Sequence, residues 1–382
     1  MSDSNKKIFV AGPAYLDRVL GIDESPLERT PGDPPVDRSV DGKLAAGGSP
    51  RRTLELVDAS KSTIAIKLPE SWPGPFGTIE IATDWTSDLL KRTNKQEFLQ
   101  PFRRSIESSS WHDDLGGMGA GYASALAGKL FSALGAGNDP IGGRVASFLS
   151  DQSIEHHPIF IPGKSSDWTL LVTSGRRGDK LAIGFRGAHD SIERLPDSWA
   201  DPCDLRVVAG LPNRIVAEAF QVNDQSIRLF APSIRNMRDR APSVGSFAGK
   251  FNLLCCNRLE WETLGDREAI ERSTPIVATT DGANGCVVRF WDRAGVRREI
   301  LEPAFPRERP PRDTNRAGEA FASTLVTTLI ELNGTVDRVD PALIQAAAKR
   351  ASAAAALELD LVRFGFPTRF AIDRAVQDGV IP

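Results

Sequence analysis

Residues 312–321, RDTNRAGEAF, place a carboxylate and two small residues at the start of an apolar helical pattern, FASTLVTTLIEL. Ala317 and Gly318 leave the backbone amides of the first helical turn open to a ligand. Such amides bind anions, and the helix dipole strengthens the attraction. Glu319, beside them, can accept the proton of a hydroxyl group that attacks a bound phosphate. The segment therefore predicts a site for phosphoryl transfer with Glu319 as its base.

Two residues of this segment allow other interpretations. Glu319 can instead be a first-turn acidic residue that only stabilises the helix dipole. Arg316 has three possible roles: a positive clamp on phosphates, a plug that fills the anion site or pairs with Glu319, or a solvent-facing residue. The sequence leaves these alternatives open.

Apolar runs predict the sheet that must position this helix. Residues 205–211, 251–256 and 275–280 are continuous runs, typical of parallel strands that are covered on both faces, and residues 8–12 form a short first strand. Helical patterns alternate with them: GYASALAGKLFSALG, GGRVASFLSDQ and LIQAAAKRASAAAALEL. We predict an α/β fold with a doubly wound, mostly parallel sheet flanked by helices.

A different pattern occupies the region after the first strand. Residues 25–50 are rich in Pro, Gly and Asp, which predicts an irregular linker. The segments TLELV, STIAIKLP and GTIEIATDW then alternate apolar and polar residues. This alternation predicts a small antiparallel sheet with one buried face.

Polar residues follow several of the predicted strands, where doubly wound sheets bind their ligands. Asp17 follows the first strand, Asn257 and Glu260 follow residues 251–256, and Thr280 begins the turn TDGANG. The spacing of Asn257 and Glu260 also matches a helix capping box. Asp17 can alternatively cap a turn, and TDGANG can be plain turn chemistry.

The order of these pieces resembles the ribokinase (PfkB-type) family of carbohydrate kinases over residues 6 to about 31 and 111 to about 367. The motifs that carry the resemblance are LGGMGAGYASALAGKL, GNDPIG at 137–142, RGAH at 186–189, NRLE at 257–260, the loop 280–285, and DTNRAGE at 313–319.

The resemblance implies a ribokinase-like kinase domain formed by residues 1–37 and 111–382. Residues 38–110 would be an insertion that enlarges an antiparallel β lid, or a solvent-facing elaboration without effect on chemistry. It also implies ATP-dependent phosphoryl transfer to a hydroxyl of a sugar or sugar-like molecule, with ATP and Mg²⁺, a monovalent cation near Asp313, and a homodimer formed through the lid.

Site residues carried over from the family fall into three groups. The catalytic group is Glu319 as base, with Arg316, Ala317 and Gly318 at the anion hole. The cofactor group is Asn257 and Glu260, which would also order Mg²⁺, with Thr280, Gly282 and Gly285. The substrate group is Tyr15, Asp17, Gly116, Gly117, Gly121 and Arg186, although the glycines can also serve close helix packing.

The chain departs from the family pattern at three of these positions. Glu319 replaces an Asp, Arg316 replaces a Gly, and Gly121 replaces an Asn that contacts substrate. The extra methylene of Glu319 predicts slow transfer, because positioning errors of about 1 Å cost on the order of 100-fold in rate. The alternative function is a catalytically impaired homologue that acts by binding a ligand or nucleotide.

Composition favours small-molecule partners. The 382 residues carry a net charge of −3, so no basic field attracts nucleic acid or a membrane surface. No apolar run approaches the roughly 20 residues of a membrane span. Four scattered cysteines form no CxxC pair, which is typical of a reducing compartment, and we predict a cytoplasmic protein.

Overall fold

The computed structural model describes residues 6–22, 55–59, 63–67, 78–82, 111–174, 180–185, 187–361 and 363–381. Arg186 and most of the predicted linker and insertion lie outside the described residues. The division of the chain at residues 37 and 111 therefore stays a prediction.

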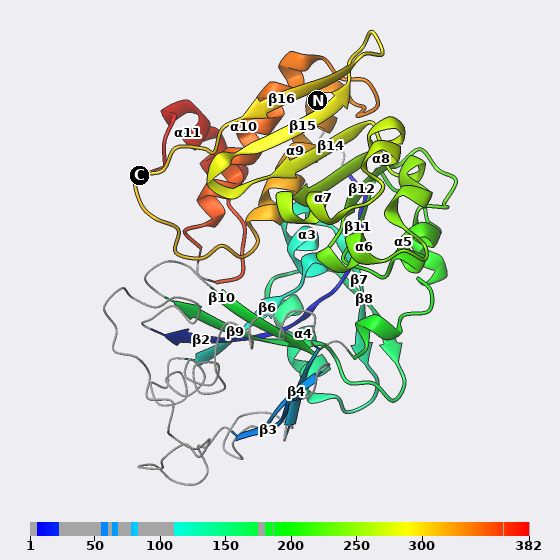
Figure 1. Ribbon diagram of the computed structural model, residues 1–382, viewed down its shortest axis with the longest axis vertical. Helices are drawn as coiled ribbons and strands as arrows, with labels where there is room; N and C mark the ends of the chain where they lie inside the picture. The colour runs from blue at the N-terminus through cyan, green and yellow to red at the C-terminus, as the bar shows by residue number, and fades with distance from the viewer. Residues whose placement is uncertain are drawn as a thin grey trace.

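A nine-stranded sheet forms the centre of the molecule, in the order β16-β15-β14-β13-β12-β11-β1-β7-β8 (Figure 1). Its strands are β1 (Ile8–Ala11), β7 (Lys129–Gly135), β8 (His156–Ile161), β11 (Leu205–Ala209), β12 (Ile227–Ala231), β13 (Leu253–Asn257), β14 (Ile276–Thr280), β15 (Cys286–Trp291) and β16 (Arg297–Glu302). All pairings from β8 across to β14 are parallel, and β15 and β16 complete the sheet in antiparallel pairing. The predicted runs at 205–211, 251–256 and 275–280 are confirmed as the parallel strands β11, β13 and β14.

Helices cover both faces of this sheet. They are α3 (Met118–Leu126), α4 (Pro140–Asp151), α5 (Asn213–Ala219), α6 (Ile234–Arg238), α7 (Arg258–Thr263), α8 (Arg267–Ser273), α9 (Ala317–Asn333), α10 (Pro341–Glu358) and α11 (Arg369–Asp378), with short 3₁₀ turns at His189–Ser191, Asp197–Ala200, Val244–Lys250 and Gly282–Asn284. One apolar core joins the sheet to α3, α4, α9 and α10, and a second joins it to α5–α8. Neighbouring residues of one strand enter opposite cores, as Val207 and Val208 do, which is why the run is apolar without alternation. The doubly wound fold is confirmed.

One predicted helix is shorter than its pattern. We predicted a helix through GYASALAGKLFSALG, but α3 ends at Leu126 and residues 129–135 form β7. Ala127 takes a left-handed conformation (φ 50°) and its N–H caps the last turn. A side chain at Gly128 would lie 3.0 Å from Ile8 Cγ2, so a small residue there lets the chain enter the sheet beside β1. The apolar period of a strand buried on both faces is indistinguishable from that of a buried helix.

Two small sheets accompany the main one. The first, called the small sheet below, has the order β10 (Lys180–Phe185), β9 (Trp168–Ser174), β2 (Tyr15–Ile22), β6 (Trp111–Gly116). The second contains β3 (Glu55–Ala59), β4 (Thr63–Lys67) and β5 (Thr78–Ala82), all antiparallel as predicted. Within the small sheet β2 and β9 run parallel, whereas the other pairs are antiparallel. Figure 1 shows both sheets at the end of the molecule below the main sheet.

Among the described residues, no helix is long and apolar enough to cross a membrane.

Candidate active site

The N-terminal turn of α9 presents open backbone amides, as its sequence predicts. The first hydrogen bond within the helix runs from the N–H of Ala320 to the carbonyl of Arg316 (2.9 Å), so the amides of residues 317–319 precede any helical acceptor. Gly318 is exposed, and a Cβ atom placed on it would meet nothing within 4 Å. This turn can therefore receive an anion.

Two cavities meet at the turn. The first, called the Asp17 pocket, has a volume of about 370 Å³ and is lined by Asp17, Tyr122, Glu260 and Glu319 among others. The second, called the Gly282 pocket, has a volume of about 510 Å³ and is lined by the loop after β14, by residues 304–311 after β16, and by residues of α9 and α10. Thr280, Thr314, Gly318 and Phe321 line both. Two molecules, one bound in each pocket, would therefore meet at Gly318.

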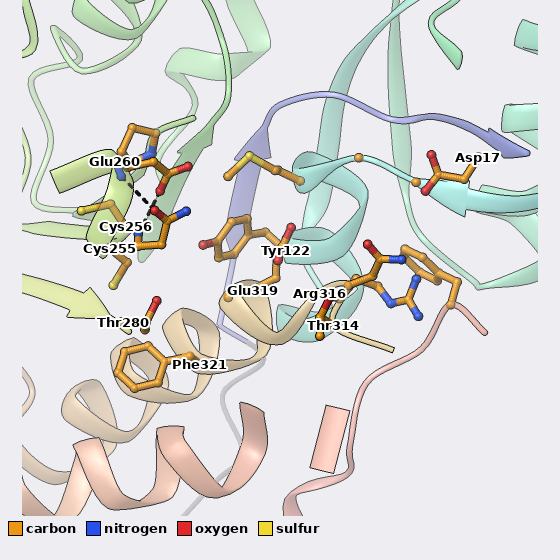
Figure 2. Close-up of a pocket in the computed structure, with 18 of the residues that line it drawn as sticks. Asp17, Tyr122, Cys255, Cys256, Glu260, Thr280, Thr314, Arg316, Glu319 and Phe321 are labelled. Carbon is orange, nitrogen blue, oxygen red and sulfur yellow. Dashed lines mark hydrogen bonds between the residues drawn. The ribbon is translucent and has the colours of Figure 1, made fainter. Parts of the chain in front are cut away.

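Asp17 lies at one end of its pocket, and Glu319 lies across the pocket from it (Figure 2). Asp17 is in β2 of the small sheet and is only 9% exposed. A Cβ atom on Gly116 would lie 2.3 Å from Asp17 Oδ2, so the glycine makes room for this carboxylate. Gly117 has φ 104°, and a Cβ there would lie 2.2 Å from the carbonyl oxygen of Pro13. Gly116 therefore leaves space for the Asp17 side chain, and Gly117 leaves space for the backbone of Pro13.

Glu319 points towards Tyr122 in Figure 2, from the first turn of α9. Tyr122 in α3 is 2% exposed and lines the same pocket. Burial, and then the charge of Glu319, raise the pKa of this phenol well above its usual value, so it stays a neutral hydrogen-bond donor. Sequence reasoning missed Tyr122, because an aromatic residue in an apolar helix is normally a core residue. The sequence signal that could have identified Tyr122 is its place directly after Gly121, a position already predicted to belong to the substrate site.

Asn257 and Glu260 are brought together at the end of β13 as a capping box. The Glu260 N–H donates to Asn257 Oδ1 (2.8 Å), and the Asn257 N–H donates to Glu260 Oε2 (2.9 Å). The predicted cap is confirmed, and both side chains also line the Asp17 pocket. Burial, which outweighs the Asn257 hydrogen bonds, raises the pKa of Glu260 to about 7.

The loop after β14 lines the Gly282 pocket with backbone rather than with large side chains. Gly282 (φ 53°) and Gly285 (φ 88°) both take left-handed conformations. A Cβ on Gly285 would lie 2.1 Å from the carbonyl oxygen of Glu302, so no other residue fits there without movement. Asp281 does not face a ligand, because its carboxylate accepts bonds from Arg258 and Asn284.

Arg316 turns towards α10. Its Nε donates to Glu358 Oε1 (3.0 Å), its Nη2 donates to the carbonyl of Arg363 (3.0 Å), and its guanidinium lies 5.7 Å from the ring centroid of Phe364. The side chain is 10% exposed, so the interpretation of Arg316 as a solvent-facing residue is wrong. Its ion-pair partners are Glu358 and, at 3.9 Å, Asp313, whereas the plug interpretation allowed a pair with Glu319. Arg316 also lines the Asp17 pocket. Burial raises the pKa of Glu358 to about 7 even though Arg316 acts to lower it.

Asp313 is engaged in the turn before α9. Its Oδ1 accepts from the Asn315 N–H (2.8 Å), and its Oδ2 accepts from Asn315 Nδ2 (3.1 Å). Among the described residues, no group of three or more His, Cys, Asp or Glu side chains could hold a metal ion. The cation near Asp313 stays a prediction.

No family model matches the chain, and no curated protein matches its sequence. Solved structures do match it over nearly its whole length. A nucleoside kinase of Methanocaldococcus jannaschii, an archaeal member of the ribokinase family, is 12% identical, with 98% of each chain covered and a TM-score of 0.62. The ribokinase of Giardia lamblia is 15% identical (98% and 100% covered, TM-score 0.62). The ribokinase of Arabidopsis thaliana, solved with ribose and ATP, is 13% identical (97% and 99% covered, TM-score 0.59). At these identities the likeness concerns the fold, and the chain has the fold of the ribokinase-family kinases.

Proposed function

We propose that this protein transfers a phosphoryl group from ATP to a hydroxyl of a sugar or sugar-like molecule. The observation that carries the proposal is the meeting of two pockets at Gly318, on an open helix N-terminus, with the Glu319 carboxylate on the side of the Asp17 pocket. Phosphoryl transfer requires little covalent chemistry from the protein. The reaction requires that the two bound molecules are aligned and that the charge of the transferred group is stabilised.

The Asp17 pocket suits the acceptor. Asp17 and Glu319 offer carboxylates from opposite sides, one from the small sheet and one from α9 (Figure 2). Asp17 would accept hydrogen bonds from acceptor hydroxyls and so fix their orientation. Glu319 would take the proton of the attacking hydroxyl as the oxygen–phosphorus bond forms.

The Gly282 pocket suits the nucleotide, because its loop places backbone groups close to a ligand and reaches the helix N-terminus at Gly318. The amides of residues 317–319 would stabilise the negative charge of the transferred phosphoryl group. They are already fixed in direction by α9, so little reorganisation is required during the reaction.

Asn257 and Glu260 fit Mg²⁺ by the chemistry of their oxygens. A magnesium ion keeps most of its waters and contacts a protein through few carboxylates, and here one carboxyl and one amide line a single pocket. Burial, and to a smaller degree the charge of Glu319, raise the pKa of the Glu260 carboxyl, and a bound cation would favour its charged form. When bound, the ion would neutralise phosphate charge. The capping box would hold Glu260 in a fixed orientation.

The alternative, an impaired homologue that acts by binding alone, rests on the exchange of a glycine for Arg316. Arg316 lines the Asp17 pocket, but its guanidinium is engaged by Glu358 and Phe364, and a Cβ atom on Gly318 would meet nothing within 4 Å, so Arg316 does not fill the space beside Gly318. This arrangement supports catalysis over impairment.

A screen of sugars, nucleosides and polyols for acceptor-dependent conversion of ATP to ADP tests the proposal, with nucleotide binding followed by the change in melting temperature on adding ATP and Mg²⁺. We expect at least one hydroxylated acceptor to support turnover. Stabilisation by ATP and Mg²⁺ without turnover on any acceptor would favour the binding protein, and the absence of both would contradict each assignment.

A further inference from the structure

Gly121 in α3 lies directly against the side chain of Glu319. A Cβ atom placed on Gly121 would lie 3.1 Å from Glu319 Cγ and 3.6 Å from Glu319 Cβ. On the other side it would lie 3.5 Å from Phe366 Cζ, an ordinary van der Waals distance. The distance to Glu319 Cγ is shorter than carbon atoms normally tolerate. Any side chain at position 121 would therefore press on Glu319.

The surroundings of Gly121 leave Glu319 as the group that must yield. α3 cannot withdraw easily, because Gly119 packs on the backbone of Gly12 so closely that even a Cβ there would come within 2.4 Å of the Gly12 carbonyl carbon. Phe366 is also fixed, since its ring packs edge-to-face against Phe364 at a centroid distance of 6.0 Å. A half-buried glutamate with three side-chain torsions is the softest of these neighbours.

We propose that Gly121 is a positioning residue for Glu319, and that the space left by the missing side chain sets the direction of the carboxylate. The inference rests on the proposed function, in which Glu319 is the base. It differs from the expectation that position 121 contacts the substrate, because the residue acts here through Glu319. A glycine is otherwise unfavourable in the interior of a helix, so its presence needs such a reason.

The substitution Gly121→Ala separates this role from a structural one. Alanine favours the helix, so we expect the variant to be folded and no less stable than the parent. A shift of Glu319 by a few tenths of an ångström should lower kcat by about tenfold, while KM for ATP changes by less than about twofold. Gly143→Ala is the matched control, since Gly143 is also the fourth residue of its helix and a Cβ there meets nothing within 4 Å. We expect it to leave kcat unchanged.

A thermal double-mutant cycle gives a readout that does not depend on activity. In the Glu319→Ala background the Cγ atom that presses on position 121 is absent, so we expect Gly121→Ala to raise the melting temperature by about 1 °C, the same gain that we expect for Gly143→Ala in the parent. With Glu319 present the gain should be smaller or absent, because the contact opposes it.

The proposal requires both results. Equal melting-temperature changes in the two backgrounds would overturn it, because Gly121 and Glu319 would then not be coupled. An unchanged kcat for Gly121→Ala in an active protein would overturn it as well, because the contact would not direct the base. A parent protein that transfers no phosphate to any acceptor marks a different failure, that of the proposed function, and the thermal cycle would still report whether the two residues press on each other.

Discussion

Arg316 takes a backbone conformation that favours glycine. Its φ of 62° costs a residue with a side chain on the order of 1–2 kcal/mol. The contacts with the fully buried Glu358 and with the carbonyl of Arg363 occupy the guanidinium. Arg316 therefore forms part of the wall of the Asp17 pocket, while the backbone at Gly318 stays open.

The substitution Arg316→Gly tests where the guanidinium acts. It relieves the backbone strain but leaves the Glu358 carboxyl buried without its cation, and we expect a net loss of stability of about 1–3 kcal/mol. Affinity for ATP should change by less than about threefold. Thermal unfolding and nucleotide titration of the variant measure the two effects. A tenfold or greater loss of ATP affinity would show instead that Arg316 clamps phosphates.

At the scale of elements, the Arg316–Glu358 pair joins the first turn of α9 to the last residue of α10. The charged neighbours that act on Glu358 are Arg316, Glu319 and Asp313. Its pKa in the folded protein is about 7, above the ordinary value of 4.5, so the folded state holds this proton more tightly than the unfolded chain does. This contribution to stability is present at low pH and is lost as the pH rises towards 7.

We therefore predict that the unfolding free energy of the parent falls as the pH rises from 5 to 8, and that Glu358→Gln shows a flatter dependence over the same range. Glu260 also has a raised pKa and is common to both proteins, so the difference between their profiles isolates Glu358. Chemical denaturation at several pH values measures it. Parallel profiles would contradict the assignment.

The sequence was sufficient to predict most elements but not where α3 ends. Continuous apolar runs identified β11, β13 and β14, and alternation identified the sheet of β3, β4 and β5, because each pattern follows from which faces are buried. The boundary at Ala127 depends on its left-handed conformation and on the close approach of Gly128 to β1. These are tertiary contacts that periodicity does not record.

The site was predictable where its residues are neighbours in sequence. The spacing of Asn257 and Glu260 predicted their capping box, and the small residues before Glu319 predicted an open helix turn. The pairing of Arg316 with Glu358 was not predictable, because 42 positions separate them and no local pattern connects the two. The role of Tyr122 depends on how α3 packs against α9, which only the fold determines.

At the scale of the whole molecule, the fold assembles the Asp17 pocket from residues of the small sheet and residues of α9. Asp17 comes from β2, and Glu319 from α9, about 300 residues later. We expect Asp17→Asn to raise KM for the acceptor by at least about tenfold, because it removes a charged hydrogen-bond acceptor. Affinity for ATP should stay unchanged. Initial rates and nucleotide titration test this, and a parallel loss of ATP affinity would show that the pocket is misassigned.

The homodimer through the lid stays a prediction at this scale. The mass of the protein in solution, measured by sedimentation, tests it directly.

The central claim is that Glu319 takes the proton from an acceptor hydroxyl while the first turn of α9 holds the phosphoryl group. The most direct measurement is the rate of phosphoryl transfer from ATP to an acceptor in the parent and in Glu319→Gln, with ATP affinity measured on the same samples. Glutamine keeps the length of the side chain but cannot accept the proton, so we predict a fall in kcat of at least about 100-fold with ATP affinity within about twofold of the parent. A Glu319→Gln variant that transfers phosphate at the parent's rate would contradict the account.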